Sequence, residues 1–229
     1  MKALITQSNY IPWKGYFDAI NQADVFVIYD TVQYTKRDWR NRNKIKTPQG
    51  IQWLTIPVQV AGKFEQSIDE TLVAEPDWTK QHWRTLIQNY SRARFFKQLE
   101  PTFEKLYLDC HEQKLSEVNF RFIKAVCELL NIKTKIQWSS EFEHTGDKSE
   151  KLIQICQSLG VTEYLTGPAA KSYLDESLFN QAAIQVTWLD YSAYPAYNQL
   201  YDSFVHEVSI VDLLFNEGDQ ATQYMKSFN

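Results

Sequence analysis

The stretch ALITQSNYIPWKGYFDAINQADVFVIY, residues 3–29, contains two apolar runs separated by an amphipathic segment. Residues 3–6 form a short apolar run, and residues 25–29 form a near-continuous one, as in parallel strands that are buried on both faces. Between them, Pro12 can occupy the first turn of a helix. Large side chains then recur at helical spacing, at Trp13, Phe17, Ile20 and Ala23. Strand, helix and strand within ~30 residues predict a right-handed crossover unit of a parallel sheet.

The same alternation returns in the second half of the chain. We expect strands at residues 51–58, 134–138, 163–166 and 184–189, and helices at residues 147–159, from about Ala169, and at residues 208–215 and 219–225. Gly160 follows one of these helices and suits a C-terminal cap. Because helices that alternate with strands are typical of a parallel sheet, we predict an α/β fold with a Rossmann-like parallel sheet and flanking helices.

Residues 77–130 differ from the rest because they carry three consecutive helical patterns. These patterns cover residues 77–90, 95–108 and 115–130, and Asp77 is a candidate N-cap of the first. No linker rich in Gly, Pro or Ser separates this middle from its neighbours. We therefore predict a single α/β domain, residues 1–229, in which residues 77–130 form a mainly helical insertion or cap.

The composition is that of an ordinary globular protein, with 44% hydrophobic and 23% charged residues and a formal net charge of -4. Aromatic residues reach 14%, which favours either aromatic core packing or a site rich in stacking. The three cysteines, Cys110, Cys127 and Cys156, are odd in number and lack metal-ligand spacing, as do the histidines, so we expect no metal site. Cys127 and Cys156 lie within apolar helical patterns, which predicts buried thiols in a reducing compartment. The sequence has no apolar run of membrane-spanning length and no apolar region of a signal peptide, so we expect a cytoplasmic protein.

Basic residues cluster in the stretch DTVQYTKRDWRNRNKIK, residues 30–46. They are Lys36, Arg37, Arg40, Arg42, Lys44 and Lys46, with Asp38 as the acidic residue among them. Tyr34, Trp39, Asn41 and Asn43 are interleaved with these charges. Arginine binds phosphate through two parallel hydrogen bonds, so the stretch predicts a phosphate or polyanion site. The alternative is a solvated loop, which is the more common role of a charge run.

Two polar segments follow the first two predicted strands. Residues 7–10 leave the first strand and residues 30–34 leave the second. Ligands of parallel sheets bind outside the carboxyl ends of the strands, so both segments should meet at one crevice. We expect that crevice to be lined by Gln7, Asn9, Asp30, Gln33 and Arg37.

Several residues have both a functional and a structural interpretation. Asp30 could bind a metal, orient a substrate amine or act as a base, or it could pair with Arg37 or Arg40. Thr166 and Gly167 lie between a strand and a helix, where backbone amides can bind an anion, and Lys171 and Tyr173 could face the same crevice. Three tyrosines near the C-terminus, Tyr194, Tyr197 and Tyr201, could pack in the core or stack on a ligand ring. No Walker loop, GxGxxG or Ser-His-Asp order can be read.

Several motifs resemble the WbqC-like family. They are QSNYIPWKGYFDAI, the run VQYTKRDWRNRNKIKTPQG, WLTIPV, LIQICQSLGVTEYLTGPAAKSYLD, YPAYNQLYDSF and SIVDLLFNEG. The helical middle matches more loosely, through Trp78, His82, Tyr90 and Ala93. The resemblance implies a role in the synthesis of bacterial surface polysaccharides such as O-antigens. It also makes His82 a candidate for catalysis, although a hydrogen-bonded structural role is an equal alternative.

The order strand, PWKGY, helix, strand is also similar to the start of HIGH-type nucleotidyltransferases and of pantothenate synthetase. In those enzymes two histidines around a glycine contact the phosphates of ATP. Gly15 matches that glycine, but Pro12 or Trp13 and Tyr16 stand where the histidines are expected. Because these histidines are absent, the similarity does not imply that this protein uses ATP. The sequence identifies no cofactor.

We predict an enzyme that transfers an acyl or aminoacyl group to the amine of a nucleotide-linked amino sugar. Asp30 or His82 would be the base, and Arg37, Arg40 or Asn41 would stabilise the oxyanion. The residues expected to bind the substrate are Gln7, Asn9, Tyr10, Trp13, Gly15, Tyr16, Gln33, Tyr34, Lys36, Arg37, Trp39, Arg40, Asn41, Arg42, Thr166, Gly167, Lys171 and Tyr173. The alternative is a non-catalytic protein that binds a polyanion or single-stranded nucleic acid. A sequence pI of about 5.6 makes nucleic acid the less favoured partner.

Overall fold

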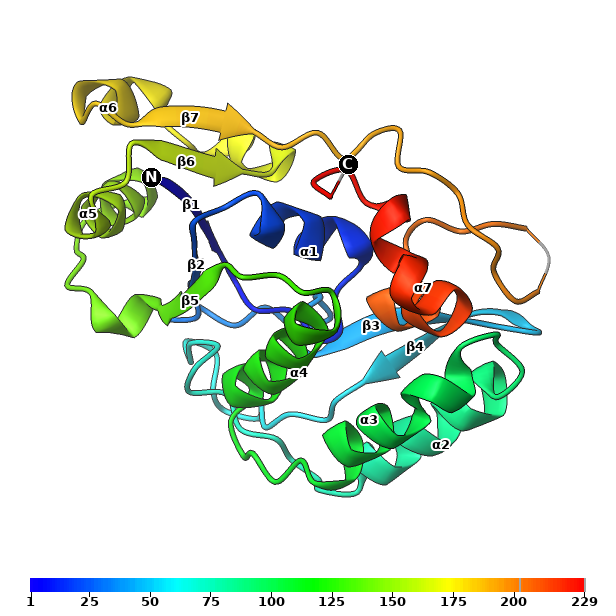
Figure 1. Cartoon of the computed structure of the whole chain (residues 1–229). Helices are drawn as coiled ribbons and strands as arrows, with labels where there is room; N and C mark the ends of the chain where they lie inside the picture. The colour runs from blue at the N-terminus through cyan, green and yellow to red at the C-terminus, as the bar shows by residue number, and fades with distance from the viewer. Residues whose placement is uncertain (202, 229) are drawn as a thin grey trace.

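A five-stranded parallel sheet forms the centre of the computed structural model, which describes residues 1–201 and 203–228. The strands lie in the order β5-β2-β1-β6-β7 (Figure 1). They are β1 (Lys2–Thr6), β2 (Val25–Ile28), β5 (Lys135–Trp138), β6 (Glu163–Thr166) and β7 (Gln185–Trp188). Because β1 pairs with both β2 and β6, the strand order reverses between β1 and β6. This arrangement confirms the predicted Rossmann-like α/β fold.

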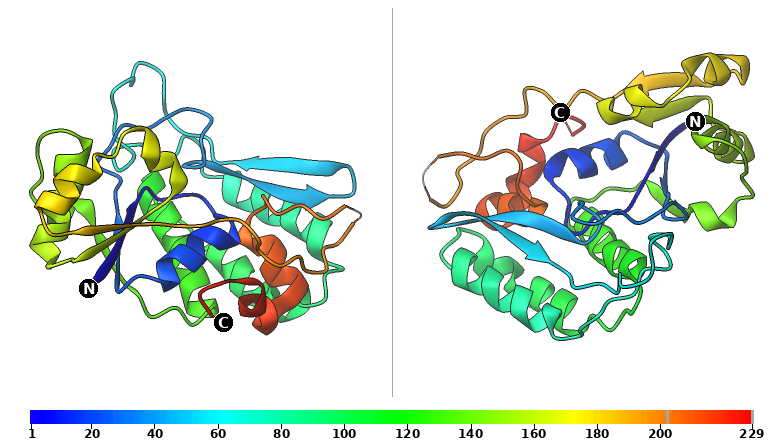
Figure 2. Two further views of the ribbon diagram at one scale, coloured as in Figure 1. Left: turned by 90° about the horizontal axis from the view of Figure 1, so that it is seen from above. Right: turned by 180° about the vertical axis from the view of Figure 1, so that it is seen from behind.

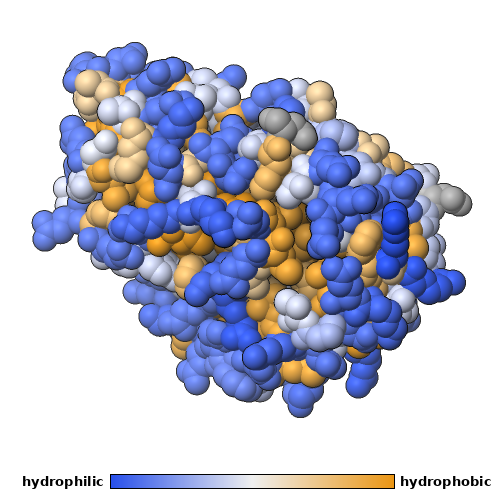
Figure 3. All heavy atoms as spheres, in the orientation of Figure 1, coloured by the Kyte–Doolittle hydropathy of each residue, from blue (hydrophilic) through white to orange (hydrophobic). Residues whose placement is uncertain are grey.

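Both faces of the sheet are buried, which explains the near-continuous apolar runs of β1 and β2. Leu4, Phe26 and Ile28 point into one hydrophobic core, whereas Ile5 and Val27 point into another. The first core is covered by α1 (Lys14–Asn21), α4 (Leu115–Leu129) and α7 (Ile210–Glu217). The second is covered by α5 (Lys148–Leu159) and α6 (Glu176–Gln181). On the face seen in Figure 1, apolar atoms show between charged ones over α1 (Figure 3).

The helical middle of the chain consists of α2 (Trp78–Tyr90), α3 (Phe96–Leu108) and α4. Its apolar faces join the same hydrophobic core as α1 and one face of the sheet, through residues such as Trp78, Phe103 and Phe122. The fold therefore places the helical middle against the sheet rather than around a separate core. The Asp77 side chain makes no capping hydrogen bond, contrary to our expectation.

The basic stretch is not a loop along its whole length. Its second half is strand β3 (Arg42–Thr47), which pairs antiparallel with β4 (Gly50–Thr55) in a separate two-stranded sheet. The predicted strand at residues 51–58 is thus the second arm of a hairpin. Its buried face carries Ile45 and Leu54, and Figure 2 shows the hairpin projecting from the body of the molecule.

A long irregular segment, residues 190–208, connects β7 to α7. Its described residues contain no helix or strand. The helix expected from Ala169 is a short 3-10 turn, Pro168–Ser172, followed by α6, and the last expected helix is also 3-10, Gly218–Tyr224. Another 3-10 turn, Ser139–Glu141, follows β5. Compact domains rarely contain structureless loops of this length unless the loop serves a function.

Two further expectations can be compared with the structure. Cys127 and Cys156 are free and buried, as predicted, and so is Cys110. In the part of the chain that the structure describes, no helix combines the length and the apolar character that a membrane span requires.

Candidate functional site

The exits of β1 and β2 meet, as predicted, through Ser8 and Asp30. The Ser8 backbone amide donates to Asp30 Oδ1 at 2.8 Å, and the Ser8 hydroxyl donates to Asp30 Oδ2 at 2.6 Å. Asp30 is almost completely buried, and this burial raises its pKa to about 6, against the opposing effects of the Ser8 hydrogen bonds and the charge of Arg40. Both carboxylate oxygens are therefore engaged in holding the two exits together.

The helical middle and the basic stretch reinforce the same junction. Asn119 of α4 donates through its side-chain amide to Ser8 Oγ and to the carbonyl oxygen of Arg40, each at 2.9 Å. Arg40 in turn donates to the carbonyl oxygen of Ser8 at 3.3 Å. The basic stretch and α4 thus both fix the backbone around Ser8, which leads into one wall of a cleft.

This cleft has a volume of about 550 Å³ and lies beside the carboxyl edge of β1. It is lined by Asn9, Pro12, Trp13, Trp39, Asn43, Tyr191, Ser192, Ala193, Tyr194, His206 and Glu207. The volume is within the range of small-molecule sites. Three parts of the chain meet here: the exit of β1, the basic stretch, and the 190–208 segment.

Two glycines allow aromatic rings to close over the ends of β1 and β6. A Cβ atom at Gly15 would lie 2.3 Å from the Trp13 indole, so the indole rests directly on the first turn of α1. A Cβ atom at Gly167 would lie 3.2 Å from the Tyr191 hydroxyl. The Trp13 and Tyr191 rings meet edge to face at 5.4 Å. The Trp13 indole therefore covers the backbone at Gly15.

The Trp13 contact gives a direct prediction for Gly15→Ala. Helix propensity alone would make this change stabilising by about 1 kcal/mol. The clash with the indole should instead destabilise the protein by about 1–3 kcal/mol and move Trp13 out of the cleft wall. Thermal melting of Gly15→Ala shows whether the change stabilises or destabilises the protein. Gly167→Ala is the milder comparison, because its nearest contact is longer, and a rise in melting temperature for Gly15→Ala would contradict the packing described here.

The rim of the cleft is formed by tryptophans and cations of the hairpin. The Trp39 and Trp53 rings lie 5.3 Å apart, and the Arg42 guanidinium lies 4.1 Å from the Trp53 ring centre. Lys44 Nζ lies 5.4 Å from the Trp39 ring and forms an ion pair with Glu207 at 3.2 Å. The basic stretch therefore supplies positive charge at the cleft mouth, beside an aromatic surface.

The 190–208 segment is held on the cleft by buried polar groups. Tyr194 donates to Asp18 at 2.5 Å, and the Lys14 ammonium donates to the carbonyl oxygen of Pro195 at 2.7 Å. Lys14 lies over the rings of Tyr194 and Tyr197, and its burial lowers its pKa to about 8. Further along, the Lys46 ammonium donates to the Gln199 side chain at 3.1 Å and to the carbonyl oxygen of Tyr201 at 2.9 Å.

A second buried carboxylate anchors the middle of this segment. Asp212 of α7 is fully buried and accepts hydrogen bonds from Tyr197 and Tyr90, each at 2.7 Å. The Tyr201 hydroxyl donates to the carbonyl oxygen of Asn89 at 2.6 Å. The sequence left open whether Tyr194, Tyr197 and Tyr201 pack in the core or stack on a ligand. In the structure Tyr194 lines the cleft, whereas Tyr197 and Tyr201 hold the 190–208 segment in place.

Among the predicted site residues, Asn9, Trp13 and Trp39 line the cleft, and Arg42 lies at its rim. Gly15, Gly167, Asp30 and Arg40 support the walls, as described above. Of the five residues expected to line one crevice, Asn9 does so and Asp30 lies behind the wall. Gln33 donates to the carbonyl oxygen of Phe64, and Arg37 is exposed.

Other predicted residues lie away from the cleft lining. His82 and Tyr10 are buried together, with Tyr10 Oη 2.9 Å from His82 Nδ1, and burial lowers the pKa of His82 to about 4. Lys171 lies over the Trp188 ring and Lys148 over the exposed Tyr173 ring. Tyr16, Tyr34, Asn41 and Thr166 are buried, Gln7 is half-buried, and Lys36 is exposed. Their part in binding stays a prediction.

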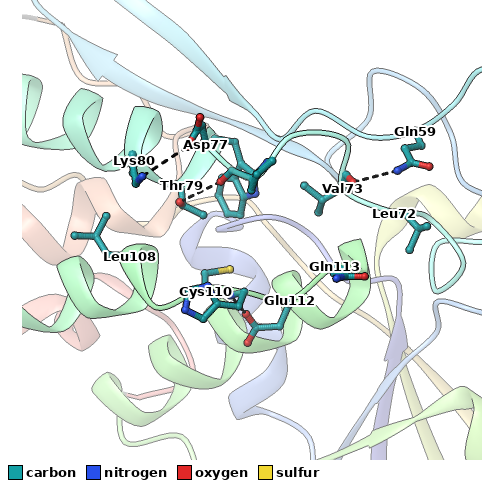
Figure 4. A pocket seen from close by; sticks show the side chains of 13 residues that line it. Gln59, Leu72, Val73, Asp77, Thr79, Lys80, Leu108, Cys110, Glu112 and Gln113 are labelled. Atoms are coloured by element: carbon teal, nitrogen blue, oxygen red, sulfur yellow. Dashed lines mark hydrogen bonds and ion pairs between the residues drawn. The ribbon is translucent and has the colours of Figure 1, made fainter.

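A second cavity, of about 500 Å³, lies between the start of α2 and the residues that follow α3. Figure 4 shows Asp77, Thr79 and Lys80 at the start of α2 on one side of it, and Cys110 to Gln113 on the other. Trp78 lines this cavity and meets the Tyr10 ring edge to face at 5.7 Å. Its described lining includes none of the predicted site residues. Among the described residues, no group of His, Cys, Asp and Glu is arranged to hold a metal ion.

Because Asp30 is buried, we expect that removing its negative charge stabilises the folded protein at high pH. Its raised pKa means that the folded state binds the proton more tightly than the unfolded state. Asp30 therefore contributes stability below its ordinary pKa of 3.8, and this contribution is lost as the pH rises through about 6. Asp30→Asn should raise the free energy of unfolding at pH 8 by about 1–3 kcal/mol and change it little at pH 4.

Denaturant unfolding at the two pH values tests this expectation. Asp24→Asn, at an exposed aspartate that accepts from the Lys2 amide, serves as the control. A loss of stability at pH 8 would show that the ionised contacts with Ser8 and Arg40 outweigh the cost of burial.

Comparisons with known proteins identify the same family as the motifs quoted in the sequence analysis. The model of the WbqC-like protein family matches residues 7–224. The uncharacterized protein Rv1507c of Mycobacterium tuberculosis (strain ATCC 25618 / H37Rv) is 50% identical over 225 residues, which cover 98% of this chain and 97% of that protein. No solved structure matches the chain. The resemblance seen in the sequence is confirmed, and the chain belongs to the WbqC-like protein family.

Proposed function

We propose that the protein is an enzyme that binds a nucleotide-linked amino sugar and transfers an acyl or aminoacyl group to its amine. The cleft carries this proposal, because its aromatic walls and cationic rim lie where parallel sheets bind ligands. Trp13, Tyr191 and Tyr194 offer ring edges and faces to a sugar or a base. Lys44 and Arg42 supply charge for a diphosphate at the mouth. Family membership supports a role in surface-polysaccharide synthesis.

His206 is the cleft group that we assign as the base. Asp30 and His82 are both buried, and the oxygens of Asp30 are already engaged with Ser8. His206 lines the cleft and is exposed. Partial burial and the positive charge of Lys14 lower the pKa of His206, so its imidazole is neutral and able to accept a proton at pH 7.

The proposed reaction needs an activated acyl donor, such as a thioester or an activated amino acid. The amine nitrogen attacks the acyl carbon and forms the new amide bond. The bond from the acyl carbon to the donor's leaving group breaks, and the proton of the amine passes to His206. Ser192 and Asn9 also line the cleft, and in this proposal they donate hydrogen bonds to the oxygen of the intermediate.

A mass-spectrometric screen tests the proposed function. The protein is incubated with a panel of nucleotide-linked amino sugars, with and without acyl-CoA, amino acids and ATP. The molecular masses of the products are then measured. We expect a mass gain on at least one amino sugar that depends on the donor. The absence of any mass gain, together with no nucleotide sugar binding in calorimetry, would contradict the proposal.

A further inference from the structure

Exposed apolar side chains gather around the hairpin and the neighbouring loops. Trp39, Ile51 and Trp53 are 37%, 42% and 38% exposed, and Phe64 reaches 74%. Single exposed apolar residues are common on soluble proteins, but large contiguous groups mark interaction sites. These four residues account for half of the large hydrophobic side chains that are exposed in the described part of the chain, so the grouping calls for an explanation.

Contacts connect these residues into one surface, which we call the docking face. Lys36 Nζ lies 5.4 Å from the Phe64 ring, and the next residue, Arg37, accepts a hydrogen bond from the Arg42 side chain at its carbonyl oxygen. The Arg42 guanidinium lies 4.1 Å from the Trp53 ring, and the Trp39 and Trp53 rings lie 5.3 Å apart. On the hairpin, Trp53 is paired with Lys44 and Ile51 with Lys46, so these side chains lie opposite the face that carries Ile45 and Leu54. The 190–208 segment covers Lys46, which is buried, whereas Ile51 and Trp53 stay exposed. Figure 2 shows the hairpin and the loop around Phe64 both projecting from the body of the molecule.

The docking face is basic, whereas the chain as a whole carries a net charge of -4. Lys36, Arg37 and Lys63 are exposed around Phe64, and Arg42 and Lys44 lie on the hairpin. Among the nearby acidic residues, Asp38 approaches the less exposed Arg40 at 3.7 Å, and Glu207 is paired with Lys44. Glu65 is exposed next to Phe64, and Glu70 interacts with the charge of Lys63. The positive charge that remains comes mainly from Lys36, Arg37 and Arg42, which form no ion pair among the described residues.

We propose that the docking face binds an anionic lipid surface. Aromatic and aliphatic side chains flanked by lysine and arginine suit the boundary between headgroups and acyl chains. Single-stranded nucleic acid is the less suitable partner. Cations already lie over the tryptophans, with Arg42 at 4.1 Å and Lys44 at 5.5 Å from the Trp53 ring, where a base would stack. This inference does not depend on the proposed transferase activity.

The position of Trp39 links the docking face to the cleft. Trp39 lines the cleft and also packs against Trp53 on the docking face. A protein docked in this way turns the mouth of its cleft toward the lipid surface. The cleft then opens onto the layer where a membrane-anchored acceptor or donor would lie.

Co-sedimentation with large vesicles tests the proposal. The protein is spun with vesicles of phosphatidylcholine alone and with vesicles that also contain phosphatidylglycerol, at low and at high salt. We expect binding to the anionic vesicles at low salt that decreases at high salt, since the attraction is electrostatic. Phe64→Ser and Lys63→Glu should each weaken this binding about fivefold or more.

Matched controls come from the opposite part of the molecule. Leu129→Ser and Lys124→Glu alter an exposed leucine and an exposed lysine of α4 and should leave vesicle binding unchanged. Absence of binding to anionic vesicles would overturn the proposal, as would equal losses in the control variants. Tighter binding to a single-stranded oligonucleotide than to vesicles, or a dimer in light scattering that Phe64→Ser dissociates, would also overturn it by assigning the face to another partner.

Discussion

Replacing His206 with glutamine is expected to lower the turnover of the proposed transfer by about 10²–10⁴-fold, because general base catalysis contributes that much. Affinity for the nucleotide sugar should change little, since glutamine keeps a polar side chain at this place in the cleft lining. Single-turnover kinetics and calorimetry on the same variant separate the two quantities. The parent enzyme should lose activity as the pH falls through the lowered pKa of His206, where the imidazole becomes charged.

The chain offers a matched control for this experiment. His111 is exposed at the second cavity, so His111→Gln should have normal turnover. Among the described residues, Lys14 acts on the charge of His206 and Glu207, which pairs with Lys44, lines the same cleft; none of these residues changes in the two variants. Normal turnover in His206→Gln would remove this residue from the reaction, whereas loss of binding without loss of turnover would assign it to substrate recognition.

Replacing Asp212 with alanine should lower the free energy of unfolding by about 3–5 kcal/mol, because each buried hydroxyl left without a partner costs about 1–3 kcal/mol and the truncation also leaves a cavity. Two buried tyrosine hydroxyls, of Tyr90 and Tyr197, would lose their acceptor, and Lys46 would lose a nearby negative charge. For a chain of this size, the melting temperature should fall by roughly 10 °C or more.

The change should also reach the cleft, because Tyr197 holds the 190–208 segment in place. Ligand affinity should fall in Asp212→Ala even well below its melting temperature. Asp109→Ala, at an exposed residue after α3, is the control and should melt like the parent protein. If Asp212→Ala unfolds at the parent temperature, the buried network does not stabilise the fold and the 190–208 segment is held by its other contacts.

The parallel sheet could be predicted from the sequence because its signals are local. The apolar runs of residues 3–6 and 25–29 and the helical spacing between them need no long-range information. The hairpin was only half predicted, since the charges of the basic stretch suggested a loop. Yet Arg42, Lys44 and Lys46 alternate with Asn43, Ile45 and Thr47, and Pro48-Gln49-Gly50 supplies the turn. This period of two, followed by a turn, was a readable sign of a hairpin.

The cleft itself was harder to predict. Polar residues at the exits of β1 and β2 were correctly expected to come together, because parallel strands end at one edge. The 190–208 segment has no periodicity, and it reaches the cleft through contacts with Asp18, Lys14 and Lys46 that lie far away in sequence. His206 and Glu207 were therefore missed. A long segment rich in tyrosine but without a pattern was the one signal available.

His82 illustrates a different limit of sequence analysis. A histidine that matches a family pattern is equally suited to catalysis or to a buried hydrogen bond. The partner that distinguishes these roles here is the Tyr10 hydroxyl, which comes from the exit of β1. Only the packing of α2 against that exit brings the two side chains together.

The central position of β1 has a consequence for how the chain is made. β1 leaves the ribosome before its two neighbours in the sheet. Its partner β2 follows closely along the chain, whereas its other partner, β6, begins only at Glu163. With synthesis at roughly 5–20 residues per second, one edge of β1 stays unpaired for on the order of ten seconds. An apolar strand with an open edge invites pairing with another chain. Nascent chains therefore need shielding until Glu163 emerges, and a truncation before that residue leaves the edge open permanently and prone to aggregation.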